Sequence, residues 1–284
     1  MSFFLTLVAE PGDLAPSLVS QVGEAVGTGP AIELAPAEAA DLPCETPPDL
    51  GHVRAALTGA PVDIVLTPAV NRRKRLLLAD MDSTIVTSET LDELAVFAGV
   101  GDRVAAITKR AMAGEIDFKG ALRERVALLR GLDLAALEQT WAATRFTPGA
   151  RELVATMRAH GATAALVSGG FTFFTARVAE ALGFDLHRAN VLLDDGAALL
   201  GQVQEPILDR DAKLATLREL APSAEDCLAV GDGANDLDMI RAAGLGVAFH
   251  AKPIVAEAAR VRIDHCGLRA LLFMQGFRST EFVQ

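Results

Sequence analysis

The sequence contains few of the residues that form cross-links or metal sites in small extracellular proteins. Its 284 residues include three cysteines, Cys44, Cys227 and Cys266, which lie far apart and form no C-x-x-C pair. The five histidines show no ligand spacing. Neither a disulfide framework nor a zinc site is therefore expected, and we interpret the cysteines as reduced side chains that fill space.

Long apolar runs are also missing. No run approaches the roughly 18 residues that a membrane-spanning helix needs. The opening segment MSFFLTLVAEPGD has no basic flank, and its apolar stretch is too short for a secretory signal. We therefore expect no membrane association and a cytoplasmic location.

Positive charge is scarce, with 26 Lys and Arg against 37 Asp and Glu and a formal net charge of −11. This balance argues against nucleic acid as a partner, because phosphates are usually met by a basic face. The deficit is uneven. Residues 1–70 hold nine acids and one base, so they carry −8 and leave −3 for the other 214 residues. The basic run at 71–75 separates the two parts, and we interpret it as a linker.

The acidic N-terminal part has the pattern of a small α+β domain. Hydrophobic periodicity predicts strands at 2–9, 31–34 and 62–66, an amphipathic helix at 14–26 and a short helix near 50–57. This order of elements favours a ferredoxin-like unit over residues 1–70.

Residues 71–284 show a different pattern. Short apolar runs at 76–79, 163–167 and 227–230 each end in polar or glycine-rich residues, and a fourth run lies at 245–249. Such runs, separated by helical stretches, are typical of a parallel sheet covered on both faces. We therefore predict an α/β fold whose chemistry lies at the carboxyl ends of the strands.

Two insertions interrupt this pattern. The helical stretch at about 88–145 is too long for one crossover, and we interpret it as a helical cap above the strand ends. Residues 189–204 are predicted to form a β-hairpin around an Asp-Gly turn.

Four carboxylates follow two of the predicted strands. Asp80 and Asp82 come after the first strand, and Asp232 and Asp236 come after the third. Because parallel strands end at one edge of a sheet, these groups should lie together there. Hard oxygen ligands without thiolate or imidazole favour Mg²⁺.

Groups that can bind an anion follow the second strand. In Ser168-Gly169-Gly170, a hydroxyl and backbone donors can approach an anion closely, and the N-terminus of a predicted helix follows. Lys213 is predicted at the start of another helix, where a cation costs about 0.3–1 kcal/mol. An anionic partner would explain its position.

Together, D-x-D-S-T, S-G-G, a lone lysine and G-D-G-x-N-D resemble the motif set of the haloacid dehalogenase superfamily of phosphotransferases. The resemblance covers about residues 74–272. It is closest to the phosphoserine phosphatases, over the stretches 80–89, 111–118, 167–171, 230–236 and 248–253. A HAD-like parallel sheet with an inserted cap is the fold that this resemblance implies.

The resemblance implies a role for each carboxylate. Asp80 would attack phosphorus and form a phosphoaspartate, and Asp82 would serve as general acid and then as general base. The Asp80 carboxylate, the Asp82 backbone carbonyl and Asp232 would bind Mg²⁺, with Asp236 supporting the site from behind.

The resemblance also implies a phosphate site and a substrate site. Ser168, the Gly169 amide and Lys213 would balance the charge of the phosphoryl group, and Gly170 and Asn235 would complete the substrate site. In the predicted cap, Glu89 would bind an amino group and Arg125 a carboxylate. Met112 and Phe118 would provide apolar cover.

The N-terminal segment resembles the small ACT-type domain that precedes the catalytic domain in longer bacterial relatives. It shows no ligand-binding glycine signature, so a structural role or homodimerisation is an equal alternative to amino-acid binding.

The resulting expectation is Mg²⁺-dependent hydrolysis of O-phospho-L-serine, the last step of serine biosynthesis, with a small phosphorylated amino acid as the partner. Phosphate transfer to an acceptor such as homoserine, action on another small phosphate monoester, and a noncatalytic amino-acid sensor remain alternatives.

Overall fold

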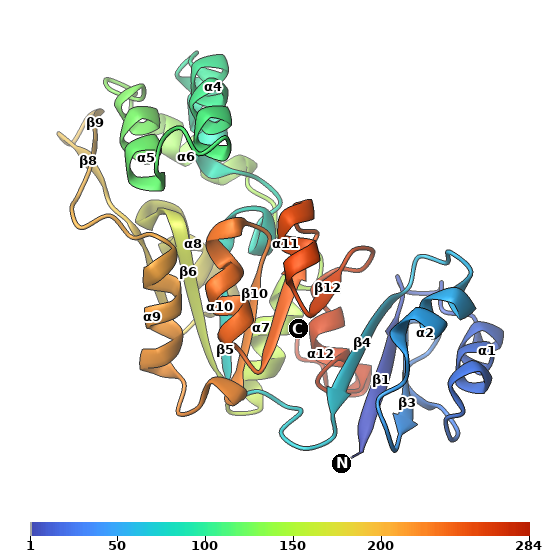
Figure 1. Ribbon diagram of the computed structural model, residues 1–284. Helices are drawn as coiled ribbons and strands as arrows, with labels where there is room; N and C mark the ends of the chain where they lie inside the picture. The colour runs from blue at the N-terminus through green and yellow to red at the C-terminus, as the bar shows by residue number, and fades with distance from the viewer. Residues whose placement is uncertain (1) are drawn as a thin grey trace.

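The computed structural model describes residues 2–284, apart from the side chain of Met112, so the predicted role of Met112 lies outside the described residues. The N-terminal part is an antiparallel sheet in the strand order β2-β3-β1-β4 with two helices on one face (Figure 1). Its elements are β1 (Phe3–Val8), α1 (Pro16–Val26), β2 (Ile32–Ala35), β3 (Ala39–Cys44), α2 (Leu50–Leu57) and β4 (Asp63–Pro68).

Strand β3 was not predicted, although it is paired on both sides within the sheet. Asp41 and Pro43 interrupt its apolar pattern. Asp41 is buried because it binds Arg72, and Pro43 lies beyond the part of β3 that pairs with β2, where a missing N–H is tolerated. With β3 included, the element order is the βαββαβ order of a ferredoxin-like unit.

A second sheet has six parallel strands in the order β12-β11-β10-β5-β6-β7, as predicted for an α/β fold. The strands are β5 (Leu76–Ala79), β6 (Thr163–Phe171), β7 (Leu186–Asn190), β10 (Cys227–Gly231), β11 (Leu245–Phe249) and β12 (Val261–Ile263). Strand β6 includes the Ser-Gly-Gly segment, and its register with β7 shifts between Val167 and Phe171.

Helices cover both faces of this sheet, because alternate residues of its central strands point to opposite sides. Leu77 packs in the core under one set of helices, whereas Leu76 and Leu78 pack in the core under the other. The first set is α7 (Ala150–Ala159), α8 (Thr172–Leu182) and α12 (Ala270–Phe273), and the second is α9 (Arg210–Leu220), α10 (Leu237–Ala242) and α11 (Pro253–Ala258).

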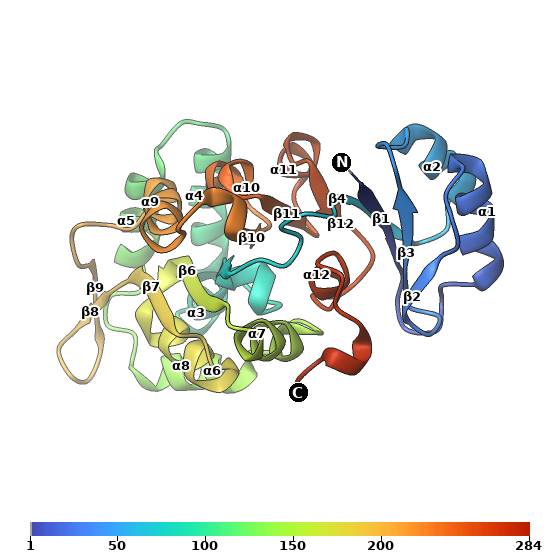
Figure 2. The same ribbon diagram turned by 90° about the horizontal axis from the view of Figure 1, so that it is seen from below.

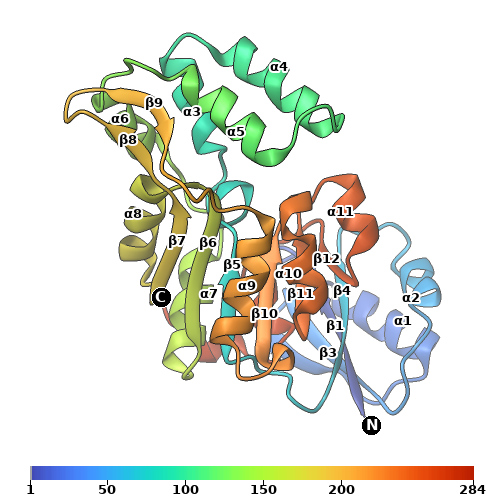
Figure 3. The same ribbon diagram turned by 60° about the vertical axis from the view of Figure 1, so that its left-hand side comes forward.

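A helical cap stands above the carboxyl ends of the parallel strands (Figure 3). It consists of α3 (Thr90–Phe97), α4 (Gly101–Met112), α5 (Phe118–Ala127) and α6 (Ala135–Ala143). The hairpin β8 (Leu192–Asp194) and β9 (Leu199–Val203) extends it, since the Gly131 amide donates to the Leu199 carbonyl at 2.8 Å. Within the described residues, no helix combines the length and the apolarity required to span a membrane.

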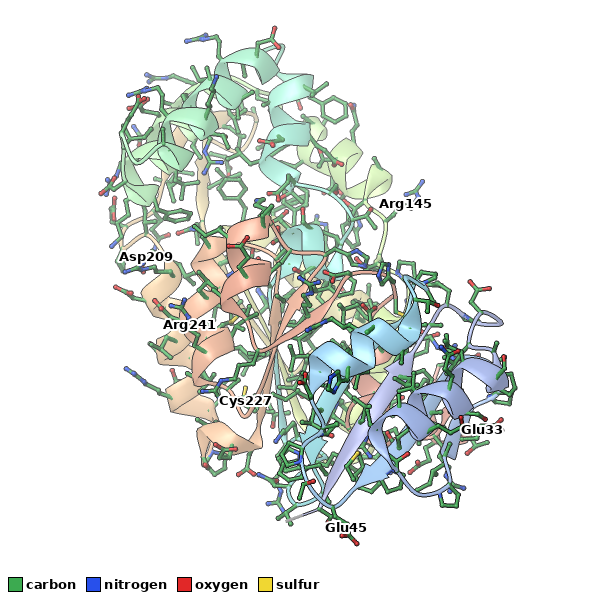
Figure 4. All side chains as sticks on the ribbon, turned by 45° about the vertical axis from the view of Figure 1, so that its right-hand side comes forward. Glu33, Glu45, Arg145, Asp209, Cys227 and Arg241 are labelled. Carbon is green, nitrogen blue, oxygen red and sulfur yellow. The ribbon has the colours of Figure 1, made fainter. Side chains whose placement is uncertain are left out.

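The N-terminal sheet is covered on both faces. Helices α1 and α2 lie on its outer face, and α12 lies between its inner face and the rest of the parallel-sheet part (Figure 2). Two of the nine N-terminal acids, Glu33 and Glu45, lie on the outside (Figure 4). Three others, Glu38, Asp41 and Asp63, are buried. The acidic charge is therefore not confined to a solvated surface.

Arg72 joins the two parts of the chain. Its guanidinium binds both carboxylate oxygens of Asp41, at 2.6 and 2.7 Å, and donates to the Thr6 hydroxyl. On the other side it donates to the Met274 carbonyl, just beyond the end of α12, at 3.0 Å. A cation at a helix C-terminus is favourable. This residue of the predicted linker is therefore a partly buried structural contact between the two parts.

Candidate active site

The first candidate carboxylates lie on a tight turn after β5. This turn, η1 (Met81–Ile85), places Ser83 at a positive φ of 54°. The Asp80 carboxylate accepts from the Met81 amide at 2.8 Å. Asp82 points elsewhere, because it accepts from the Thr90 amide at 2.9 Å. Asp80 and Asp82 are separated by one residue in the sequence. The turn points their carboxylates toward different partners.

The Ser-Gly-Gly segment of β6 lies against Asp82. The Ser168 hydroxyl donates to Asp82 Oδ2 at 3.1 Å and accepts from the Gly170 amide at 2.9 Å. A Cβ atom on Gly170 would lie 2.7 Å from Asp82 Oδ2, which only glycine avoids. A Cβ atom on Gly169 would lie 3.1 Å from the Phe118 ring, so that ring covers this segment from the cap.

Lys213 is buried between two of the predicted carboxylates. Helix α9 begins at Arg210, three residues earlier than expected, and Lys213 is 1% exposed. Its ammonium lies 2.8 Å from Asp80 Oδ1 and 2.5 Å from Asp236 Oδ1. Asp236 also accepts from the Gly233 amide at 3.0 Å. The anionic partner that the sequence suggested for this lysine is a pair of protein carboxylates.

Three carboxylates converge on one point. Asp80, Asp232 and Asp236 are all buried, and each has an oxygen within 4.8 Å of the others. The side chain of Asp82 is not part of this group, and its predicted Mg²⁺ contact through the backbone carbonyl stays a prediction. Asp236, expected only behind the metal, lies within the cluster.

The charges in this cluster shift the proton affinities of its members. Burial raises the pKa of Asp82 to about 7, and the negative charges of Glu89 and Asp80 add to this effect. Burial, together with Asp80, raises the pKa of Asp232 to about 6. Burial disfavours the charged form of Lys213, but Asp236 and Asp80 outweigh it and raise the pKa of this lysine above its ordinary value. Lys213 is therefore a permanent cation between two acids.

One cavity of about 1060 Å³ connects these groups with the cap. Predicted site residues that line it are Asp80, Asp82, Glu89, Phe118, Arg125, Ser168, Gly169, Gly170, Asp232 and Asn235. Lys213 and Asp236 lie beneath its floor.

Glu89 and Arg125 bring opposite charges to the wall and roof of the cavity. Glu89 stands at the N-cap of α3, but it caps no amide and instead accepts from the Ser83 hydroxyl at 2.8 Å. Arg125 lies near the end of α5 and donates to the Ala121 carbonyl at 3.3 Å. No carboxylate of the described residues lies within 4 Å of the Arg125 head group. Burial raises the pKa of Glu89 and lowers that of Arg125.

Two further residues of the site were not predicted from the sequence. Asn190, at the end of β7, donates to the Gly169 carbonyl at 2.9 Å and accepts from the Leu208 amide at 2.7 Å, and so it holds the Ser-Gly-Gly segment. Lys252 lines the cavity with its ammonium 3.6 Å from Asp232 Oδ2. The available signals were a polar residue at a strand end for Asn190 and, for Lys252, its place in the stretch 248–253 that resembles the phosphoserine phosphatases.

Comparisons with known proteins show the family to which the chain belongs. The family model of haloacid dehalogenase-like hydrolases matches residues 74–244. A phosphoserine phosphatase of Archaeoglobus fulgidus is 47% identical over 204 residues, which cover 70% of this chain and 59% of that protein. One of Streptomyces coelicolor is 42% identical over 231 residues, covering 80% and 56%. The chain thus spans little more than half the length of these two relatives.

A solved structure resembles nearly the whole chain. It is a probable phosphoserine phosphatase from Vibrio cholerae in unliganded form, 31% identical, with a TM-score of 0.81. The likeness covers 97% of this chain and 86% of that one, so the N-terminal unit is included.

Proposed function

Because the chain belongs to the haloacid dehalogenase-like hydrolase family, we propose that it is a Mg²⁺-dependent phosphoserine phosphatase. Its reaction would convert O-phospho-L-serine and water into L-serine and phosphate. A cytoplasmic location and a place at the last step of serine synthesis belong to the same proposal.

One observation supports this proposal: a single cavity is lined by Asp80, Ser168 and Gly169 and also by Glu89 and Arg125, neither of which forms an ion pair with another described residue. Asp80, Ser168 and the Gly169 backbone face the space where a phosphoryl group would lie. Glu89 suits the ammonium of an amino acid, and the planar head of Arg125 suits its carboxylate. The charges of the cavity thus complement a phosphorylated amino acid.

The first step forms a bond between an Asp80 oxygen and phosphorus while the bond from phosphorus to the serine oxygen breaks. The Met81 amide and Lys213 both contact Asp80 Oδ1, which fixes the position of the carboxylate. Asp82 gives its proton to the serine oxygen. A carboxyl with a pKa near 7 can be protonated for this step and ionised for the next.

In the second step, Asp82 takes a proton from a water molecule whose oxygen attacks phosphorus. The bond from phosphorus to Asp80 then breaks, which releases phosphate and restores the free carboxylate. Lys213, the Ser168 hydroxyl and the Gly169 amide balance the charge of the transferring group in both steps.

The acidic cluster fits a divalent cation. Asp80, Asp232 and Asp236 bring three carboxylates to one point, and the cations beside them are Lys213 and Lys252. Carboxylate oxygens without thiolate or imidazole suit Mg²⁺. Asp80, Asp232 and the Asp82 backbone carbonyl would hold it, and when bound it would supply charge neutralisation at the phosphoryl oxygens.

Phosphate release across phosphoserine, phosphothreonine and sugar phosphates tests the reaction and the substrate class together. Adding homoserine to the same assay and searching for phosphohomoserine separates hydrolysis from transfer. A protein that releases no phosphate from any of these compounds would contradict the proposal and favour a noncatalytic sensor.

Arg125→Ala should raise KM for phosphoserine by about 10- to 100-fold, because the substrate carboxylate loses a charged hydrogen-bond partner. KM for a neutral aryl phosphate should not change, and steady-state kinetics with both substrates would show the difference. Arg123→Ala is the matched control, since Arg123 lies on the same helix but pairs with Glu205 outside the cavity. Equal effects on both substrates would contradict the role of Arg125.

Removal of divalent cations by EDTA should abolish phosphate release, and Mg²⁺ should restore it. Asp232→Asn should raise the Mg²⁺ concentration needed for half-maximal rate by at least about tenfold, as measured by titration of the stripped protein. Asp238→Asn on α10 is the control, because Asp238 lies outside the cluster. Full activity in EDTA would exclude the metal from the reaction.

A further inference from the structure

A short loop connects β11 to α11, and together with Pro253 and Ile254, the first residues of α11, it reaches the candidate active site. Within this segment, which we call loop 250–254, the Lys252 amide donates to the Asp232 carbonyl at 3.3 Å. The Lys252 ammonium lies 3.6 Å from Asp232 Oδ2. The loop therefore contacts both the backbone and the carboxylate of Asp232.

The loop begins at a strained residue. His250 has a φ of 42°, a conformation that non-glycine residues adopt rarely and that must be held by surrounding contacts. Its amide donates to the Ile263 carbonyl at 2.8 Å. Its Nε2 lies 3.0 Å from the Cys266 carbonyl, and since a carbonyl only accepts, Nε2 carries a proton and donates. The first contact is to the last residue of β12, and the second is to the segment that follows β12.

That segment is held by the N-terminal unit. Strand β12 lies beside β4 (Figure 1), and Asp63, the first residue of β4, is buried between them. Its carboxylate accepts from three consecutive amides, those of Asp264 at 2.9 Å, His265 at 3.1 Å and Cys266 at 2.9 Å. Among the described residues no cation lies within 4 Å of this carboxylate. Its charge is therefore balanced by the 264–266 backbone.

We propose that Asp63 is a positioning residue for the candidate active site. Asp63 fixes the 264–266 segment, this segment fixes His250 in its left-handed conformation, and His250 fixes loop 250–254 against Asp232. The N-terminal unit thereby contributes to the catalytic centre from within the same chain. The expected effect on metal binding and catalysis rests on the function proposed above, whereas the mechanical connection does not.

Amide hydrogen exchange of the full-length, metal-free protein tests the connection without any substrate. Asp63→Ala should accelerate exchange at loop 250–254 by at least about tenfold, because hydrogen bonds to a charged group are worth that factor or more. His250→Asn interrupts the same path at its other end, and asparagine tolerates a positive φ, so the fold is retained. This second variant should accelerate exchange in the same loop.

Glu38→Gln is the matched control. Glu38 is another buried acid at the same boundary, but its partner is Arg269 before α12, at 3.0 Å, and not the 264–266 segment. Faster exchange at loop 250–254 in Asp63→Ala and His250→Asn, but not in Glu38→Gln, would support the proposal. Unchanged exchange in Asp63→Ala, or equal acceleration in all three variants, would overturn it.

Metal binding provides a second readout. Calorimetric titration with Mg²⁺ should give an affinity about tenfold lower for Asp63→Ala than for Glu38→Gln, because Asp232 is no longer held in place. If the wild type releases no phosphate from phosphoserine while the exchange pattern is as expected, the proposed function fails and the positioning role stands. Equal Mg²⁺ affinities in these two variants would contradict the connection to Asp232.

Discussion

The Asp80→Asn variant is expected to lose phosphoserine hydrolysis by at least about 10⁴-fold. A carboxamide cannot replace the carboxylate as nucleophile, yet its oxygen can still accept from the Met81 amide and from Lys213, so the site should keep its shape. Phosphate release measures the loss. Acid quenching with labelled substrate should trap phosphate on the peptide that contains Asp80 in the wild type and none in the variant.

Asp195→Asn makes the same chemical change in the exposed turn between β8 and β9 and should leave the rate unchanged. Labelled phosphoprotein in the Asp80→Asn variant would show that another residue is the nucleophile. Loss of hydrolysis with persistent phosphoserine binding would assign Asp80 to the chemical step and not to substrate binding.

The fold was predictable wherever local pattern and tertiary structure agree. The short apolar runs at 76–79, 227–230 and 245–249 became strands β5, β10 and β11, because strands buried on both faces need no alternation. Strand β3 was not predicted, because Asp41 and Pro43 interrupt its apolar pattern. In the sequence alone, Asp41 has the character of a surface acid. Its buried position depends on the contact with Arg72, which forms only when the two sheets pack together.

The site was predictable where chemistry follows a strand end. Asp80, Ser168 and Asp232 lie together because parallel strands end at one edge, and their motifs resemble those of the family that the comparisons identify. Lys213 was predicted as a site residue from its unfavourable position in a helix. Its burial between Asp80 and Asp236 was not readable from the sequence, since those partners come from two other strands.

Residues whose role depends on distant partners were beyond sequence reasoning. Asp63 contributed to a count of acidic charge, but it accepts from amides about 200 positions away. The roles of Asn190 and Lys252 likewise depend on contacts with distant residues. Asn190 contacts the Gly169 carbonyl, and Lys252 contacts the Asp232 carboxylate. Local patterns report which groups a segment carries, whereas the packing of segments decides which of those groups meet.

Lys213→Met should lower both activity and stability. The phosphoryl group loses a cation, which costs about 10²- to 10³-fold in rate. Asp80 and Asp236 also lose the charge between them, and removing one partner of a buried ion pair costs about 3–5 kcal/mol in the free energy of unfolding. Urea unfolding of the metal-free protein measures the second effect, and phosphate release with Mg²⁺ measures the first.

The double variant Lys213→Met with Asp236→Asn separates these two effects. Removing the Asp236 charge relieves the repulsion with Asp80, so the free energy of unfolding should return toward the wild-type value. The rate should stay low, because the phosphoryl group still lacks the Lys213 cation. If the double variant instead regained the wild-type rate, Lys213 would act only by neutralising Asp236. The charge balance at phosphorus would then have to come from Mg²⁺, Ser168 and the Gly169 amide.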